Sequence, residues 1–182
     1  MKRATPWIIT AALLVGAWLV ALVAPDDSAS AEPFVVPVTI GEAAVGRDFT
    51  VTVQDVTLAD TVSAAGGWSA EGTWLVVEVD AEANLDQYGM SFKGATLLVG
   101  DQSFRASERM PSFLSAPLVT GVSKSGALAF ELPEDARDRT AVLQLSAKDD
   151  TRVDSIAELE IDLGALTPVA EAEVRGTDWT HP

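Results

Sequence analysis

The chain has 182 residues, of which 27 are acidic and 12 basic, and its formal net charge at pH 7 is −15. All the acidic residues and ten of the basic ones lie at positions 25–182, so this part carries −17, a charge that repels phosphate backbones and excludes nucleic acid as a partner. The absence of cysteine excludes disulfides, thiolate metal sites and cysteine nucleophiles.

The amino-terminal segment has the pattern of a membrane helix. Lys2 and Arg3 precede an uncharged run that starts at Trp7 and ends at Ala24. Its 18 residues would rise about 27 Å as a helix, close to the hydrocarbon thickness of a bilayer. The positive charges lie before the run, which predicts a cytoplasmic amino terminus and an extracellular remainder. Residues 1–24 are therefore predicted to be a transmembrane signal anchor.

A second interpretation of this segment is a cleaved leader. Ala29 and Ala31, followed by Glu32, match the small-residue pattern of a signal-peptidase site, and cleavage after Ala31 would give a secreted protein. The apolar run is longer than the roughly 7–15 residues of a usual leader core, which favours retention. Residues 25–33 are then a short stalk rich in Asp, Ser, Ala and Pro. With no cysteine after the run, attachment to the membrane through a lipobox cysteine is excluded.

Residues 34–163 alternate between apolar and polar side chains, which is typical of half-buried strands. In residues 49–58 the alternation slips near Asp55, which predicts a β-bulge. In residues 73–83, Leu75, Val77, Val79 and Ala81 form one face. Further strands are predicted at residues 95–99, 102–106, 128–132, 142–147 and 159–163. Seven to eight such strands predict an antiparallel β-sandwich over residues 34–163, and residues 164–182 are predicted to be a mobile polar tail.

The sequence offers no constellation for catalysis, a cofactor or a metal ion. The single histidine, His181, stands one residue from the carboxyl end, which argues against a catalytic triad. The acidic residues of the predicted strands alternate outward, as on solvated faces, and do not form the inward pair of a glycosidase. The acidic segment at residues 148–154 lacks the spacing of a calcium loop. We therefore predict no catalytic, cofactor-binding or metal-ligating residue, and a protein that is not an enzyme.

Three apolar side chains in predicted loops are candidates for binding a partner. Trp68 follows a Gly-Gly pair, and Met110 and Phe113 lie in an unusually apolar loop. An exposed loop tryptophan is a common binding anchor. The alternative is that these side chains fold back over the end of the sandwich and cap its core.

Three segments resemble a known family. Residues 46–53, 72–79 with the following Asn84, and 126–133 are similar to strands of bacterial immunoglobulin-like domains of unknown function. These domains are telokin-like in topology, are membrane-tethered or secreted, and are common in actinobacteria. The chain is also similar to a secreted mycobacterial immunogenic antigen of the same sandwich type. The resemblance implies an immunoglobulin-like fold and a location outside the cytoplasm, and it supplies no catalytic residue.

Together these observations predict a membrane-anchored, extracytoplasmic binding module of the cell envelope. Its partner would be an envelope protein or a cell-wall ligand, and its amino-terminal helix would hold it at the membrane. One alternative is an accessory subunit of a membrane transporter or secretion complex, with the helix as the interface. The other is a secreted protein released after Ala31.

Overall fold

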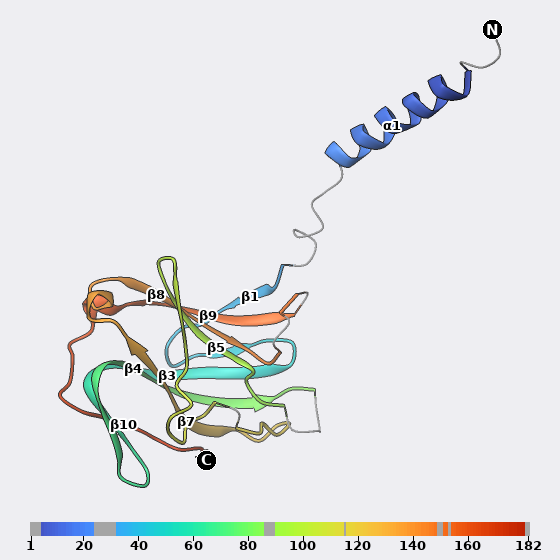
Figure 1. Cartoon of the computed structure of the whole chain (residues 1–182). Coiled ribbons are helices and arrows are strands. Elements are labelled where there is room, and N and C mark those ends of the chain that lie inside the picture. The colour runs from blue at the N-terminus through green and yellow to red at the C-terminus, as the bar shows by residue number, and fades with distance from the viewer. Residues whose placement is uncertain are drawn as a thin grey trace. The chain divides into compact units, whose positions relative to one another are not determined.

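The computed structural model describes residues 5–23, 32–85, 90–114, 116–148, 151–152 and 154–180. The chain divides into two compact units, Met1–Glu32 and Pro33–Pro182, which are described separately. Figure 1 shows a helix in the first unit and strands in the second. Ala29 and Ala31 of the predicted signal-peptidase site, and His181, lie outside the described residues.

The first unit contains helix α1 (Thr5–Val23), rich in the helix-forming residues Ala and Leu. Among the described residues, no helix is both long enough and apolar enough to cross a membrane. The predicted transmembrane helix in front of the sandwich is therefore wrong. The prediction counted the whole run from Trp7 to Ala24, but α1 ends at Val23 and Ala24 lies outside the described residues.

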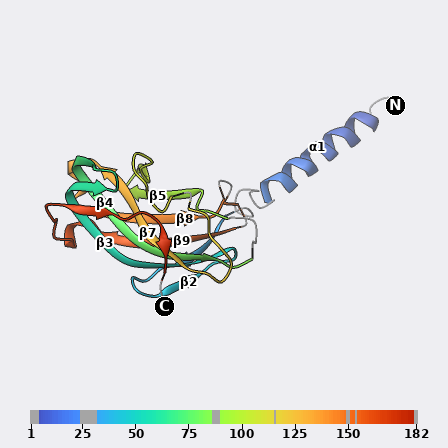
Figure 2. The ribbon, with the colours of Figure 1, turned by 90° about the horizontal axis from the view of Figure 1, so that it is seen from below.

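The second unit is a β-sandwich, which confirms the all-β prediction for this part of the chain. Sheet A has the order β1-β9-β8-β5-β6, and sheet B has the order β10-β3-β4-β7-β11 with β2 paired to β3. Figure 2 shows this unit from below. The strands of sheet A are β1 (Phe34–Pro37), β5 (Gly94–Val99), β6 (Gln102–Arg105), β8 (Thr140–Ser146) and β9 (Ser155–Asp162). Those of sheet B are β2 (Ala43–Val45), β3 (Phe49–Ala64), β4 (Trp68–Ala83), β7 (Lys124–Leu132), β10 (Ala172–Val174) and β11 (Asp178–Trp179). Two short 3-10 helices, η2 (Glu134–Ala136) and η3 (Leu163–Ala165), follow β7 and β9.

The pairing of the edge strands differs from the predicted antiparallel sandwich. The interior strands pair antiparallel, as expected. At two edges the pairs are parallel, β1 with β9 and β10 with β3. The described residues form eleven strands, more than the predicted seven to eight, because short edge strands carry too few residues to show an alternation.

The main core lies between the two sheets and follows the predicted alternation. Leu75, Val77, Val79 and Ala81 of β4 are all buried against it. The β-bulge predicted near Asp55 is confirmed, because the register between β3 and β4 shifts between Val53 and Asp55. The long β3–β4 pair therefore bends while its apolar residues stay on the core side.

A second, smaller core covers the outer face of sheet B. Trp74 and Val76 of β4 point there, away from the main core, and pack with Val62, Ala129 and Val174. Val174 belongs to β10, whose pairing with β3 brings the end of the chain over this face. Residues 164–182, for which the sequence predicts a mobile tail, thus contain two strands and a side chain that is only 1% exposed. The apolar outer face of β4 needs such a cover to remain out of water.

Candidate functional site

The three predicted partner-binding residues do not form one exposed surface. Phe113 is completely buried in the main core, where its ring centroid lies 5.9 Å from that of Phe92. Met110 is 5% exposed and belongs to the second core, on the other side of sheet B. Trp68 is half-buried beside that second core. For the loop that contains Met110 and Phe113, the structure thus favours the capping alternative.

Trp68 is held in an aromatic and cationic cluster on the outer face of sheet B. Its ring is perpendicular to that of Trp74, with the centroids 6.1 Å apart. The guanidinium carbon of Arg109 lies 5.7 Å from the Trp68 centroid and 5.3 Å from that of Trp74. Arg109 also pairs with Glu131 at 3.0 Å. These contacts fix the Trp68 side chain from two sides and leave part of it exposed.

A hollow opens on the outer face of sheet A, where one residue lacks a side chain. The pairings Gly94–Ser146 and Ser146–Ile156 place these three residues in a row across β5, β8 and β9. A Cβ atom on Gly94 would collide with the Ser146 Oγ, so the glycine keeps the row open. Ile156 packs on this outer side and is not part of the main core. The hollow has a volume of about 310 Å³.

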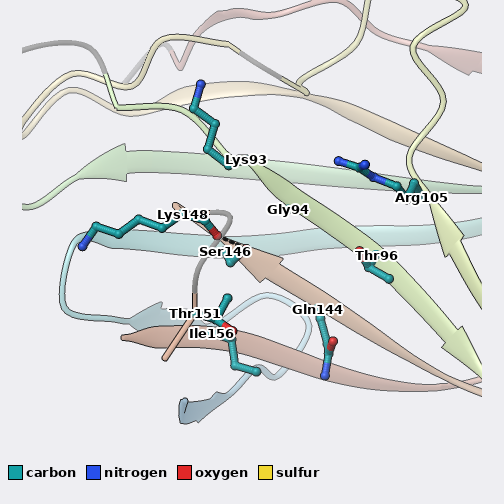
Figure 3. A pocket seen from close by; sticks show the side chains of 9 residues that line it. All are labelled: Lys93, Gly94, Thr96, Arg105, Gln144, Ser146, Lys148, Thr151 and Ile156. Atoms are coloured by element: carbon teal, nitrogen blue, oxygen red, sulfur yellow. Dashed lines mark hydrogen bonds between the residues drawn. The ribbon is translucent and has the colours of Figure 1, made fainter. Parts of the chain in front are cut away.

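Polar and cationic side chains surround this space, which we call the cationic hollow. The next row across the sheet pairs Arg105 of β6 with Thr96 of β5, and Thr96 with Gln144 of β8. In Figure 3, Lys93 and Lys148 lie at one end of the hollow and Arg105 at the other. The full lining is Lys93, Gly94, Thr96, Arg105, Gln144, Ser146, Lys148, Thr151 and Ile156.

The charge of Lys148 is compensated by two carboxylates. Its Nζ atom lies 2.6 Å from Oδ2 of Asp48 and 2.6 Å from Oδ2 of Asp154. The ion pairs with these carboxylates, that with Asp154 contributing most, raise the pKa of Lys148 above its ordinary value. Burial of Asp154 works to raise its pKa, but the ion pair with Lys148 and the hydrogen bond from the Ser155 amide outweigh it, so the pKa of Asp154 is lowered. Lys148 thereby ties the start of β3 to the start of β9.

Lys93 and Arg105 leave the hollow with positive charge. Within the described ranges, neither side chain forms an ion pair with a carboxylate. Thr96, Ser146 and Thr151 add hydroxyl groups, and the Ser146 hydroxyl already donates to the Lys148 carbonyl oxygen at 3.1 Å. Ammonium, guanidinium and hydroxyl groups are all donors, so the hollow is suited to an anion.

Sequence reasoning missed this site, because Lys93, Arg105 and Lys148 come together only through the register of β6, β5 and β8. In the part of the chain that the structure describes, no group of three or more His, Asp or Glu side chains is placed to hold a metal ion.

Comparisons with known proteins show similarity at the level of fold. No family model matches the sequence, and no curated protein matches it. One similar solved structure is an uncharacterized beta-sandwich protein from Clostridium difficile 630, with 10% sequence identity and a TM-score of 0.48 over 70% of this chain and 95% of that chain. Another is the yjhA protein from Bacillus subtilis, with 21% identity and a TM-score of 0.47 over 67% of this chain and 99% of that chain. Neither assigns an activity or a ligand to this chain.

Proposed function

We propose that the sandwich is a non-catalytic binding module that recognises an anionic group in the cationic hollow. The observation that carries this proposal is the gathering of Lys93 and Arg105 around the open row at Gly94. They lie in a part of the chain with a net charge of −17, where most cations would be expected to pair with a carboxylate. Two cations left without such a pair at one hollow indicate a ligand that carries the opposite charge.

The proposed ligand is a phosphate-bearing or carboxylate-bearing component of the cell envelope. The apolar segment after Lys2 and Arg3 is typical of sequences that direct export, and the resemblance to secreted immunoglobulin-like domains agrees with it. Anionic cell-wall polymers are abundant outside the cytoplasm. A single anionic group would enter the hollow while the strongly negative surface around it limits non-specific attachment of the polymer.

Titration of the full chain with inorganic phosphate, followed through the amide resonances of Gly94, Thr96 and Ser146, tests the site. We expect saturable changes in the chemical shifts of amides in these strands and not elsewhere. Replacing Lys93 and Arg105 together by glutamine is expected to weaken binding about tenfold or more, since each removes a charged hydrogen-bond donor. Arg109→Gln removes one positive charge from the opposite sheet and serves as the control for a general change in charge. An equal loss in Arg109→Gln, or no binding by the unaltered protein, would overturn the proposal.

The location is tested by the amino terminus of the protein recovered from each cell fraction. A mature protein in the medium that starts at Glu32 would support a secreted module. Recovery only from the cytoplasm, with Met1 retained, would contradict it.

A further inference from the structure

An apolar groove adjoins the cationic hollow. It has a volume of about 450 Å³ and is lined by Leu85, Met90 and Ala147, together with Asp48, Ser91, Lys93 and Lys148. Leu85 is 70% exposed, and Met90 is partly buried on the edge of the main core. Methionine is flexible and adapts to ligands of different shape. The groove thus offers apolar contacts at the surface of an otherwise strongly acidic domain.

The hollow and the groove meet at two shared residues, because Lys93 and Lys148 line both. A lysine presents apolar methylene groups along its length and a charge at its tip, so this boundary suits the junction between an alkyl chain and an anion. Asp48 also lines the groove, and it shares the single positive charge of Lys148 with Asp154, so these three residues together carry a net charge of −1. The positive charges that would hold an anion in the hollow are therefore those of Lys93 and Arg105.

We infer that the site binds a single-chain alkyl phosphate, with the phosphate in the cationic hollow and the alkyl chain in the apolar groove. This inference rests on the proposed function and specifies its ligand. Phosphate is favoured over carboxylate because the hollow offers more donors than the two oxygens of a carboxylate use. These donors are Lys93, the forked guanidinium of Arg105 and the hydroxyls of Thr96 and Thr151. Leu85 and Met90 line the groove and not the hollow, which sets the orientation of the ligand.

The test measures the affinity of the full chain for monomeric alkyl phosphates from methyl to octyl, each below the concentration at which it forms micelles. Affinity is expected to rise about fourfold per methylene over the first members, the factor that corresponds to about 0.8 kcal/mol per buried methylene. Leu85→Ser is expected to flatten this rise and to leave the affinity for inorganic phosphate unchanged. Val45→Ser removes an equally exposed apolar side chain from β2 and is the control for general loss of surface hydrophobicity.

The outcomes separate this inference from the proposed function. If inorganic phosphate binds with the expected dependence on Arg105 but the octyl ester binds no tighter, the amphiphile assignment is overturned and the anion site stands. The assignment is also overturned if affinity increases with chain length as steeply in Leu85→Ser as in the unaltered protein. The same holds if Val45→Ser reduces this increase as much as Leu85→Ser does. Octanoate binding as tightly as octyl phosphate would contradict the preference for phosphate. Binding to phosphatidylglycerol vesicles without binding to monomeric esters would replace the single-chain ligand by a membrane surface.

Discussion

Lys148 and Asp154 form an ion pair of 2.6 Å in which the carboxylate is almost entirely buried and the ammonium is more than half exposed. The pair closes the strand-to-strand connection between β8 and β9 at the mouth of the cationic hollow. Its buried half makes the stability of the sandwich sensitive to acid, because a protonated Asp154 would lose its partner inside the protein.

The free energy of unfolding is therefore predicted to fall in acid. The pKa of Asp154 is lowered in the folded state, so its contribution is present above the unfolded value of about 4 and is lost as the pH falls through the folded value. The raised pKa of Lys148 has the opposite effect on stability. Its contribution to the free energy of unfolding is present below the unfolded value of about 10 and is lost as the pH rises through the higher folded value. In urea unfolding at neutral pH, Asp154→Asn is expected to lower the free energy of unfolding by about 1–2 kcal/mol. Between about pH 7 and 3 its free energy of unfolding should fall less steeply than that of the unaltered protein; we call this fall the acid limb. Glu160→Gln, on the exposed face of β9, should keep the acid limb of the unaltered protein; an unchanged limb in Asp154→Asn would refute the assignment.

Gly126 is predicted to be required for the packing of Phe113. A Cβ atom at this position would lie 2.8 Å from the Phe113 Cδ2, so alanine must displace a ring that is fully buried. Gly126→Ala is expected to cost about 1–3 kcal/mol, measured as a lower urea midpoint. Gly176→Ala meets no atom within 4 Å and should change stability little. Adding Phe113→Leu should recover part of the loss, and a strictly additive double variant would show that the two positions do not interact.

The end of the chain is predicted to be part of the folded unit. Val174→Ala removes apolar contacts with Trp74 and the second core, and we expect a loss of about 1–2 kcal/mol in the free energy of unfolding. Val169→Ala, at a more exposed position, is the matched control and should cost less. Equal stability of Val174→Ala and the unaltered protein would indicate that β10 is not docked in solution.

Arg109 is predicted to fix the environment of the two tryptophans. Arg109→Gln removes its contacts with both rings and its ion pair with Glu131, so the near-ultraviolet circular dichroism of Trp68 and Trp74 should weaken. The expected loss of stability is about 0.5–1 kcal/mol, since the cluster is partly exposed. Glu131→Gln tests the ion pair alone and should leave the aromatic signal largely intact. A spectrum unchanged in Arg109→Gln would show that the rings order themselves without it.

The long strands could be predicted from the sequence because their alternation is a local property. Leu75 to Ala81 of β4 show it clearly, and even the bulge at Asp55 is visible as a change of phase. The burial of Phe113 and Met110 could not be predicted from the sequence. Phe113 occupies space that the missing side chain of Gly126 leaves, and Met110 packs in the second core, to which β10 contributes Val174. The cationic hollow depends on cross-strand register, which brings together residues that are far apart in the sequence. The β10 strand has three residues, too few for any periodicity.

The parallel pairing of β10 with β3 has a consequence for how the protein is made. Synthesis proceeds from the amino terminus, so the long β3–β4 hairpin leaves the ribosome well before β10. Until then Val62, Trp74 and Val76 lack their cover, and the hairpin presents an apolar surface to other chains. Such long-range pairing slows folding, which gives aggregation and chaperones time to compete. A nascent chain stalled before residue 172 should therefore recruit holding chaperones that a chain extended past β10 no longer needs.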